Sequence, residues 1–110
     1  MKIAIPVSGG ALAAHFGHCE RFSVFTVDGT IIRGREELTP PEHEPGAFPQ
    51  FLRGKGVDVV IAGGMGQRAQ SLFSQHGIRV VCGAGSGDPT KIVQEYVGGS
   101  LRTGENACDH

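Results

Sequence analysis

The sequence predicts an α/β fold with a mixed sheet and about three helices, and two observations lead to it. In the second half of the chain, apolar strand-like runs alternate with amphipathic helical segments, which is typical of right-handed crossovers around a parallel sheet. In the first half, the hairpin signal Asp28-Gly29 joins two strand-like segments, so antiparallel strands are expected there. A length of 110 residues suits one domain with one modest core.

The elements of the first half follow from local composition. Residues 2–7 form a short apolar run that predicts a strand ending at the loop Ser8-Gly9-Gly10. Residues 21–27 are rich in aromatic and β-branched side chains and predict a second strand. Residues 30–38 predict a charged edge strand that returns from the turn. Residues 39–49 hold four of the six prolines and therefore predict a loop that leads into a short helix.

The second half repeats a strand-then-helix pattern. The end of the short helix is marked by Gly54 and Gly56, and the near-continuous apolar run 57–62 then predicts a strand buried on both faces. Residues 67–76 carry apolar side chains at helical spacing, and residues 78–82 predict the next buried strand. Asp88-Pro89 is a helix N-cap followed by proline at the first helical position, so a last helix begins there.

Charge and composition exclude several classes of function. The net charge of −1 gives no attraction to nucleic acid or to an anionic membrane surface. No apolar run approaches the ~20 residues of a membrane helix, and the apolar start of the chain is too short for a signal peptide. The three cysteines then suggest a reducing compartment, so a cytoplasmic protein is expected.

The cluster His15-Phe16-Gly17-His18-Cys19 is the strongest chemical signal in the sequence. It places imidazole and thiol groups in a glycine-rich loop, and these groups suit zinc, copper(I) and iron–sulfur chemistry. No paired carboxylates, serine nucleophile elbow or lysine P-loop accompany the cluster, so a metal carrier rather than an enzyme is predicted. The candidate metal ligands are His15, His18, Cys19, Cys82, Cys108 and His110. The alternative is that Cys19 and Cys82 pack as small apolar residues and that the terminal pair binds adventitious metal.

A second motif, Gly64 to Ala69, fits G-x-G-x-x-A between a strand and a helix. Its backbone N–H groups are suited to a pyrophosphate or to the sulfide and oxo groups of an anionic cluster. The following strand ends without the acidic residue that would hold a ribose, which favours the cluster. Arg68 either adds positive charge to this site or is simply solvated, and Met65 is either a soft contact or a packing residue.

The fold itself predicts where these motifs meet. The loops after Val7, Ala62 and Cys82 should gather at the carboxyl ends of the parallel strands, where open α/β sheets bind ligands. Cys82 is then expected near the loop that carries His15 and Cys19.

The chain also resembles a known family. The opening strand, the loop His15-Phe16-Gly17-His18-Cys19 and residues 56–69, in that order, resemble the dinitrogenase iron–molybdenum cofactor biosynthesis family over roughly residues 1–100. The resemblance implies a ribonuclease-H-like three-layer fold with a mixed five-stranded sheet. Members of that family carry the iron–molybdenum cofactor or its precursor, and others hold a molybdenum–copper sulfide cluster.

The family motifs map onto two places in this chain. The His-Phe-Gly motif falls on residues 15–17 and the Gly-Gly-x-Gly turn on residues 63–66, whereas a ligand role for Cys19 is not implied. The chain lacks the partner-docking domains of larger assembly proteins, so the resemblance implies a small stand-alone carrier.

The resulting prediction is one domain, residues 1–100, with a flexible tail over residues 101–110. It binds and carries a metal–sulfur cluster, either iron–molybdenum cofactor-like or molybdenum–copper sulfide, at the carboxyl ends of the parallel strands, and exchanges it with a donor or acceptor protein. The predicted cluster-binding residues are Ser8, Gly9, His15, Phe16, Gly17, His18, Gly63, Gly64, Met65, Gly66 and Arg68. No nucleic-acid or membrane partner is expected, and the protein is expected to be a monomer or a weak homo-oligomer.

Three alternatives remain open at this level. A nucleotide- or anion-binding regulatory module would use the turn at Gly64–Ala69. A zinc or copper chaperone would bind bare ions through Cys19 and the terminal Cys108 and His110. A nuclease is disfavoured because the first strand carries none of the carboxylates that two-metal phosphoryl transfer requires.

Overall fold

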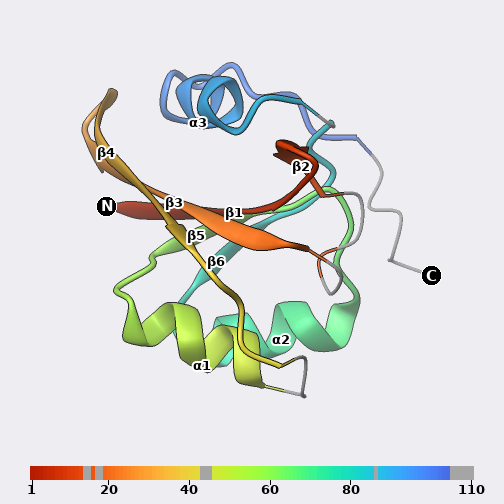
Figure 1. Ribbon diagram of the computed structural model, residues 1–110. Coiled ribbons are helices and arrows are strands. Elements are labelled where there is room, and N and C mark those ends of the chain that lie inside the picture. The colour runs from red at the N-terminus through yellow and green to blue at the C-terminus, as the bar shows by residue number, and fades with distance from the viewer. Residues whose placement is uncertain (14–15, 17–18, 43–45, 86, 105–110) are drawn as a thin grey trace.

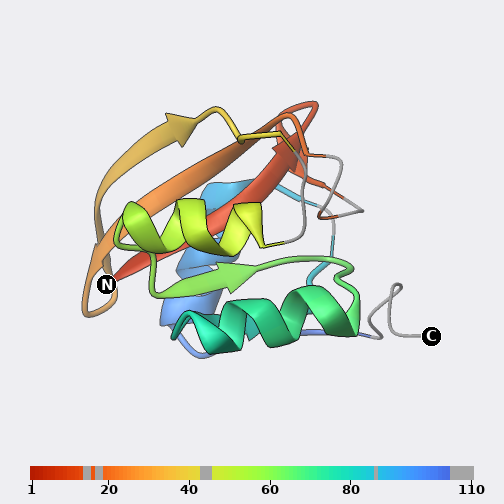
Figure 2. The same ribbon diagram turned by 90° about the horizontal axis from the view of Figure 1, so that it is seen from below.

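The computed structural model, which describes residues 1–13, 16, 19–42, 46–85 and 87–104, has three layers. A twisted sheet lies between helix α3 on one face and helices α1 and α2 on the other, as Figures 1 and 2 show. The strands are β1 (Lys2–Ser8), β2 (Ala11–Leu12), β3 (Arg21–Asp28), β4 (Ile31–Leu38), β5 (Val59–Ile61) and β6 (Arg79–Val81). The helices are α1 (Ala47–Gly54), α2 (Gln67–Gln75) and α3 (Pro89–Val97). The predicted α/β class with three helices is therefore confirmed.

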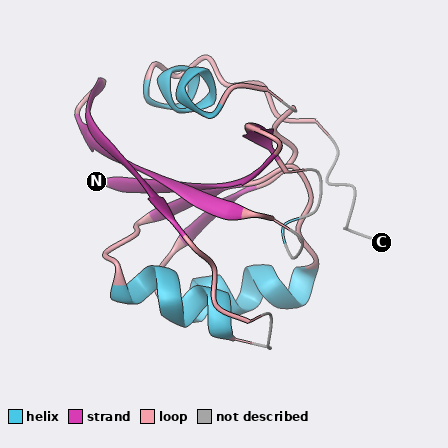
Figure 3. Ribbon diagram, viewed as in Figure 1, coloured by secondary structure: helices cyan, strands magenta, loops and turns pink. Residues whose placement is uncertain are grey.

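The sheet is mixed, as the sequence predicts (Figure 3). Its strand order is β4-β3-β1-β5-β6. The parallel part runs from β1 through β5 to β6, whereas β3 is antiparallel to both β1 and β4. The two halves of the sequence thus form the two halves of one sheet, with β1 at their junction.

A short strand, β2, was not predicted from the sequence. Ser8 pairs with Ala11 across a turn in which Gly9 and Gly10 have φ values of 62° and 81°. Two consecutive positive φ angles form the tight hairpin turn that matches strand twist, and glycine adopts them without strain. The predicted loop after β1 therefore begins as a two-residue hairpin that adds a sixth strand to the expected five.

Alternating side chains of the central strands divide the core between the two faces of the sheet. Ile3, Ile5 and Val7 pack towards α3, whereas Ala4 lies on the face covered by α1 and α2. That second face is rich in phenylalanine, contributed by loop, strand and helices. The buried phenylalanines of this aromatic cluster are Phe16, Phe22, Phe48 and Phe73.

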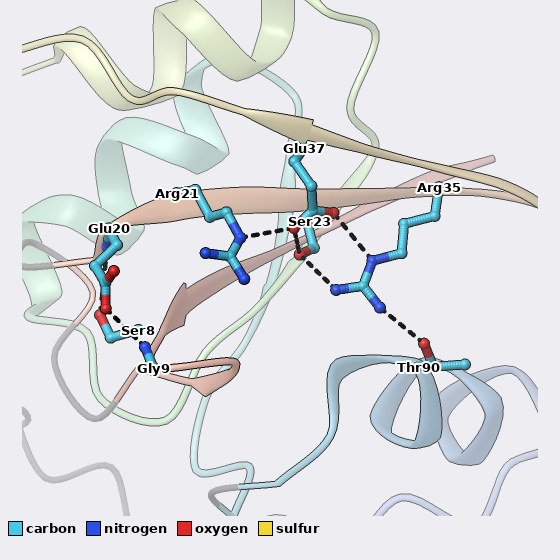
Figure 4. A network of polar contacts seen from close by, with 8 residues as sticks. All are labelled: Ser8, Gly9, Glu20, Arg21, Ser23, Arg35, Glu37 and Thr90. Atoms are coloured by element: carbon cyan, nitrogen blue, oxygen red, sulfur yellow. Dashed lines mark hydrogen bonds and ion pairs between the residues drawn. The ribbon is translucent and has the colours of Figure 1, made fainter.

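A polar network ties the outer hairpin to α3 (Figure 4). The Arg35 guanidinium donates hydrogen bonds to Glu37 at 3.0 Å and to Thr90 of α3 at 3.0 Å. The fully buried Ser23 hydroxyl donates to the Glu37 carboxylate of the edge strand at 2.7 Å and is therefore hydrogen-bonded. Burial alone would raise the pKa of Glu37, but hydrogen bonds from Arg35, Ser23 and Arg21 outweigh it and hold that pKa below its usual value.

Pro6 marks the place where β1 and β5 part. The parallel ladder between these strands pairs Ile3 with Val59 and Ala4 with Val60, and it ends there. Proline has no N–H group to continue such a ladder. The Pro6 carbonyl accepts a hydrogen bond from Ala13 N at 2.8 Å. The chain after β2 therefore crosses the end of the sheet beside Pro6.

No helix within the described residues is long and apolar enough to cross a membrane.

Candidate functional site

The loops that follow β1, β5 and β6 gather at one end of the sheet, on the right in Figure 1. Phe16 N donates to Gly64 O at 3.3 Å, and Gly83 N donates to Gly63 O at 2.8 Å. Leu12 N donates to Gly87 O at 3.0 Å. The predicted meeting of these loops is therefore confirmed. We call residues 8–13, 16, 62–66 and 82–87, as far as they are described, the carboxyl edge.

Phe16 anchors the N-terminal loop in the core. Its ring is 6% exposed and lies 5.3–5.7 Å from the ring centroids of Phe22, Phe48 and Phe73. The contacts with Phe48 and Phe73 are edge-to-face, an arrangement that aromatic pairs prefer. The aromatic ring of the predicted His-Phe-Gly motif therefore positions the loop and is not presented to solvent.

Helix α2 begins at the carboxyl edge with its positive end uncapped. Gly66 is its N-cap, in an extended conformation with φ −65° and ψ 156°, and among the described residues no side-chain cap accepts from the first-turn N–H groups. The first turn contains no acidic residue, and the exposed Arg68 lies within it. Uncapped N–H groups and the helix dipole together favour an anion at this position.

The side chain of Glu20 already binds the turn between β1 and β2. Gly9 N donates to Glu20 Oε1 at 2.7 Å, and Glu20 N lies 3.3 Å from Ser8 Oγ (Figure 4). Of the predicted ligand contacts, Gly9 N is thus engaged with the Glu20 carboxylate, and the Ser8 hydroxyl accepts from the backbone N–H of the same residue. An anionic ligand would have to displace Glu20 before it could use the Gly9 N–H group.

Cys19 and Cys82 are both half-buried and pack against the same aromatic face of the core. The expectation that Cys82 lies near the N-terminal loop is met to that extent. Burial raises the pKa of the Cys19 thiol to about 11, although a hydrogen bond from its own backbone acts in the opposite direction. Cys19 is therefore a protonated thiol at neutral pH, and a metal ion must displace its proton in order to bind.

The family of the chain is decided by its match to a family model. The model for the dinitrogenase iron–molybdenum cofactor family matches residues 1–99. The chain belongs to this family. An uncharacterized protein of Methanocaldococcus jannaschii, MJ0580, is 32% identical over 85 residues, which are 73% of this chain and 72% of that protein.

Solved structures of similar proteins have the same fold. The crystal structure of PH0822 matches with a TM-score of 0.87 and 29% identity over 94% of both chains. The apo form of the orange protein from Desulfovibrio gigas matches with a TM-score of 0.77 and 23% identity, over 96% of this chain and 93% of that one. At that identity the orange protein shows the shared fold alone.

In this member of the dinitrogenase iron–molybdenum cofactor family, the remaining predicted site residues divide into two groups. Met65 is 1% exposed and packs in the aromatic face, so its side chain would have to leave the core to touch a ligand. The other group lies outside the described residues and consists of His15, Gly17, His18, Cys108 and His110. Within the described part of the chain, no three His, Cys, Asp or Glu side chains come together as a metal site.

One contributor to the edge was missed in the sequence. Gly104 N donates to Gly83 O at 2.7 Å, and Thr103 forms an antiparallel bridge with Ala84. Within the tail expected over residues 101–110, Thr103 and Gly104 thus pair with the loop after β6, while residues 105–110 lie outside the described residues. The only sequence signal was the glycine at position 83, which is common after any strand.

Proposed function

We propose that the protein binds and carries an anionic metal–sulfur cluster at the carboxyl edge, as cargo and without catalysing a reaction. The observation that carries the proposal is the uncapped start of α2, set beside loops that backbone hydrogen bonds join into one surface. Membership of the dinitrogenase iron–molybdenum cofactor family supports a cluster rather than another anion. The cargo we favour is a thiometallate, either a molybdenum–copper sulfide or a precursor related to the iron–molybdenum cofactor.

Electrostatics support an anion at this position. Arg68 lies in the first turn of α2, where a cation is unfavourable by about 0.3–1 kcal/mol because the helix dipole is positive there. A bound dianion such as a thiomolybdate would attract both Arg68 and the positive end of the helix. It would also accept hydrogen bonds from the first-turn N–H groups, which have no side-chain cap. The terminal sulfides of such a cluster are acceptors, which suits an edge that offers donors.

Side-chain ligation would come from the N-terminal loop. Cys19 is half-buried beside the aromatic cluster, and His15 and His18, outside the described residues, flank the anchored Phe16 in sequence. Thiolate and imidazole both suit copper(I) and other soft metal ions. The high pKa of Cys19 favours a secondary role, in which backbone donors hold the anion and the thiol is recruited afterwards.

A carrier must release its cluster to another protein. We therefore include a donor or acceptor protein in the cytoplasm in the proposal. A cluster held mainly by hydrogen bonds and charge can leave without breaking several metal–ligand bonds. The open end of the sheet also leaves one side of the cargo accessible to a second protein.

The decisive experiment is reconstitution with tetrathiomolybdate plus copper(I), and separately with iron plus sulfide. Visible absorbance and the metal-to-protein ratio are measured after desalting. We expect a retained chromophore that Arg68→Ala weakens, whereas Arg79→Ala retains it, because Arg79 begins β6 at the opposite end of the parallel strands. A second variant, His18→Ala with Cys19→Ala, separates side-chain ligation from backbone binding. No retained metal in either mixture would reject the proposal.

A nucleotide-binding regulatory module is the second candidate, because the same uncapped turn at Gly66 suits a phosphate. Thermal shift with adenine and guanine nucleotides in the same buffers distinguishes the two. A nucleotide shift that Arg68→Ala abolishes, together with no retained chromophore, would favour the regulatory module.

A further inference from the structure

The carboxylate of Glu20 is held by a backbone N–H group of the β1–β2 turn and not by a cation. Gly9 N donates to Glu20 Oε1 at 2.7 Å, a distance typical of a charge-assisted hydrogen bond (Figure 4). The neighbouring Arg21 guanidinium binds Glu37 at 2.8 Å instead. None of the ion pairs between described residues includes Glu20. The turn itself therefore holds a negative charge.

The turn has room for an anion larger than a carboxylate group. Gly9 and Gly10 are exposed, and a Cβ atom built on either would meet no described atom within 4 Å. Their φ values of 62° and 81° favour glycine, so no side chain covers the N–H groups of the turn. Backbone N–H groups presented by such turns form anion-binding sites.

The Glu20 side chain can leave the turn while the backbone stays in place. Glu20 N donates to Val7 O at 2.9 Å, and Arg21 pairs with Val7 at the start of β3. These contacts fix the chain at position 20 independently of the carboxylate. Because Glu20 is exposed, water solvates its carboxylate once the side chain has rotated away. Displacing Glu20 from Gly9 thus breaks one hydrogen bond and no secondary structure.

We propose that Glu20 is an internal competitor of the cargo: its carboxylate closes the β1–β2 turn of the empty carrier, and a sulfido or oxo group of the cluster replaces it. This inference rests on the proposed function, and it adds the Gly9 N–H group to the uncapped start of α2 as a second donor site on the carboxyl edge. An anion that binds the turn alone has to displace Glu20 first. A cluster that also binds at α2 keeps that contact whether or not Glu20 has moved. Glu20 therefore keeps small anions such as phosphate out of the empty carrier.

The test combines binding affinity with a direct signal from the Gly9 amide. The parent, Glu20→Ala, Glu20→Gln and Glu36→Ala are titrated with inorganic phosphate, with tetrathiomolybdate, and with tetrathiomolybdate plus copper(I). Glu36→Ala is the matched control, because it removes one exposed carboxylate from the outer strand β4. Heteronuclear NMR follows the Gly9 amide, and visible absorbance after desalting measures cluster retention. Tetrathiomolybdate affinity comes from the titration.

We expect tetrathiomolybdate to bind Glu20→Ala about threefold to tenfold more tightly than the parent, because no internal hydrogen bond has to be broken first. Glu20→Gln should gain less, since its amide oxygen can still accept from Gly9 N. Phosphate should shift the Gly9 amide resonance in Glu20→Ala and leave it unchanged in the parent. Glu36→Ala should bind as the parent does.

The outcomes separate this inference from the proposed function. The inference is overturned if Glu20→Ala binds tetrathiomolybdate no more tightly than Glu36→Ala, or if none of the anions shifts the Gly9 amide. Cluster retention by the parent would then leave the proposed function standing without it. Conversely, Glu20→Ala whose Gly9 amide responds to tetrathiomolybdate, while no protein retains a cluster, would reject carriage and keep the anion site at the turn.

Discussion

The Phe16 ring packs edge-on against Phe73 with 5.3 Å between ring centroids, and this contact fastens the N-terminal loop to helix α2. The same loop donates from Phe16 N to Gly64 O, in the turn that leads into α2. One residue therefore fixes the loop both to the body of α2 and to the turn before it. Packing of Phe16 in the core therefore also positions the loop at the candidate binding surface.

Replacing Phe16 by alanine should destabilise the protein by about 3–5 kcal/mol, because it leaves a cavity among three aromatic rings. Phe16→Leu should cost less and fold, but should retain less cluster because the loop is held less firmly. Phe51→Ala is the control, since Phe51 is only partly buried and lies at the rim of the cluster, 6.5 Å from the Phe22 ring. Denaturant unfolding and cluster retention measure the two effects. Parental retention in a folded Phe16→Leu protein would contradict the positioning role.

Much of the fold can be predicted from the sequence because local sequence signals agree with the tertiary structure. Asp88 accepts from Lys91 N at 3.3 Å, as its position before Pro89 predicts for an N-cap. His76 at the end of α2 lies 2.9 Å from Leu72 O through Nδ1, in keeping with its expected place at a helix C-terminus. These features depend on neighbours in the sequence, which is why spacing alone reveals them.

The features that sequence could not supply depend on residues far apart in the chain. A backbone hydrogen bond joins Gly104 N to Gly83 O, and nothing in the sequence around either glycine marks the other as its partner. Glu20 accepts from Gly9 N across the loop, so a turn that looks open in the sequence already holds a carboxylate. Phe16 lies between His15 and Gly17 outside any apolar run, and only the three-dimensional packing shows that its ring belongs to the core.

The Cys19 thiol should react slowly with iodoacetamide at neutral pH. Burial raises its pKa to about 11 from 9.0, so the thiolate population is about 100-fold lower than that of a cysteine at the reference value. Alkylation is followed by mass spectrometry in a Cys82→Ser, Cys108→Ser background between pH 7 and pH 11, with urea-unfolded protein as the control. The rate should keep rising through pH 10. A plateau near pH 9 in the folded protein would contradict the assignment.

The same raised pKa predicts a loss of stability in alkali. The unfolded thiol ionises near pH 9, whereas the folded thiol keeps its proton until about pH 11, so the folded state binds more protons in that window. The free energy of unfolding should therefore fall as pH rises between 9 and 11. Cys19→Ala should remove this part of the slope, which chemical denaturation at stepped pH would detect.

Glu37 predicts the opposite behaviour in acid. Its pKa is lowered, because hydrogen bonds from Arg35, Ser23 and Arg21 outweigh the effect of burial. Its contribution to stability is therefore present above the unfolded pKa of about 4.5 and is lost as pH falls through the lower folded value. The carboxylate side chain is 39% exposed, so the effect should stay below about 1 kcal/mol. Glu37→Gln should flatten the acid limb of the unfolding curve. Glu36→Gln on the same strand controls for the loss of one charge, and an equal flattening in both variants would argue against the network.

Substituting the N-cap of α2 should change stability and cluster binding in opposite directions. Gly66 has a φ of −65°, and a Cβ there would meet nothing within 4 Å, so a side chain fits without strain. Gly66→Asp and Gly66→Asn should each stabilise the protein by a few tenths of a kcal/mol, because either side chain can accept from the uncapped N–H groups. Both should weaken retention of a thiomolybdate–copper cluster by competing for those donors. Aspartate should weaken it more, since its charge repels the anion.

Comparing Gly66→Asp with Gly66→Asn separates charge repulsion of the cluster from competition for the N–H donors at the start of α2. The difference in cluster affinity between Gly66→Asp and Gly66→Asn measures repulsion, and their shared loss measures the donors withdrawn from the ligand. Thermal unfolding and chelator competition on the same preparations give both quantities. If both variants were more stable and yet bound cluster as well as the parent, the start of α2 would not be the binding site.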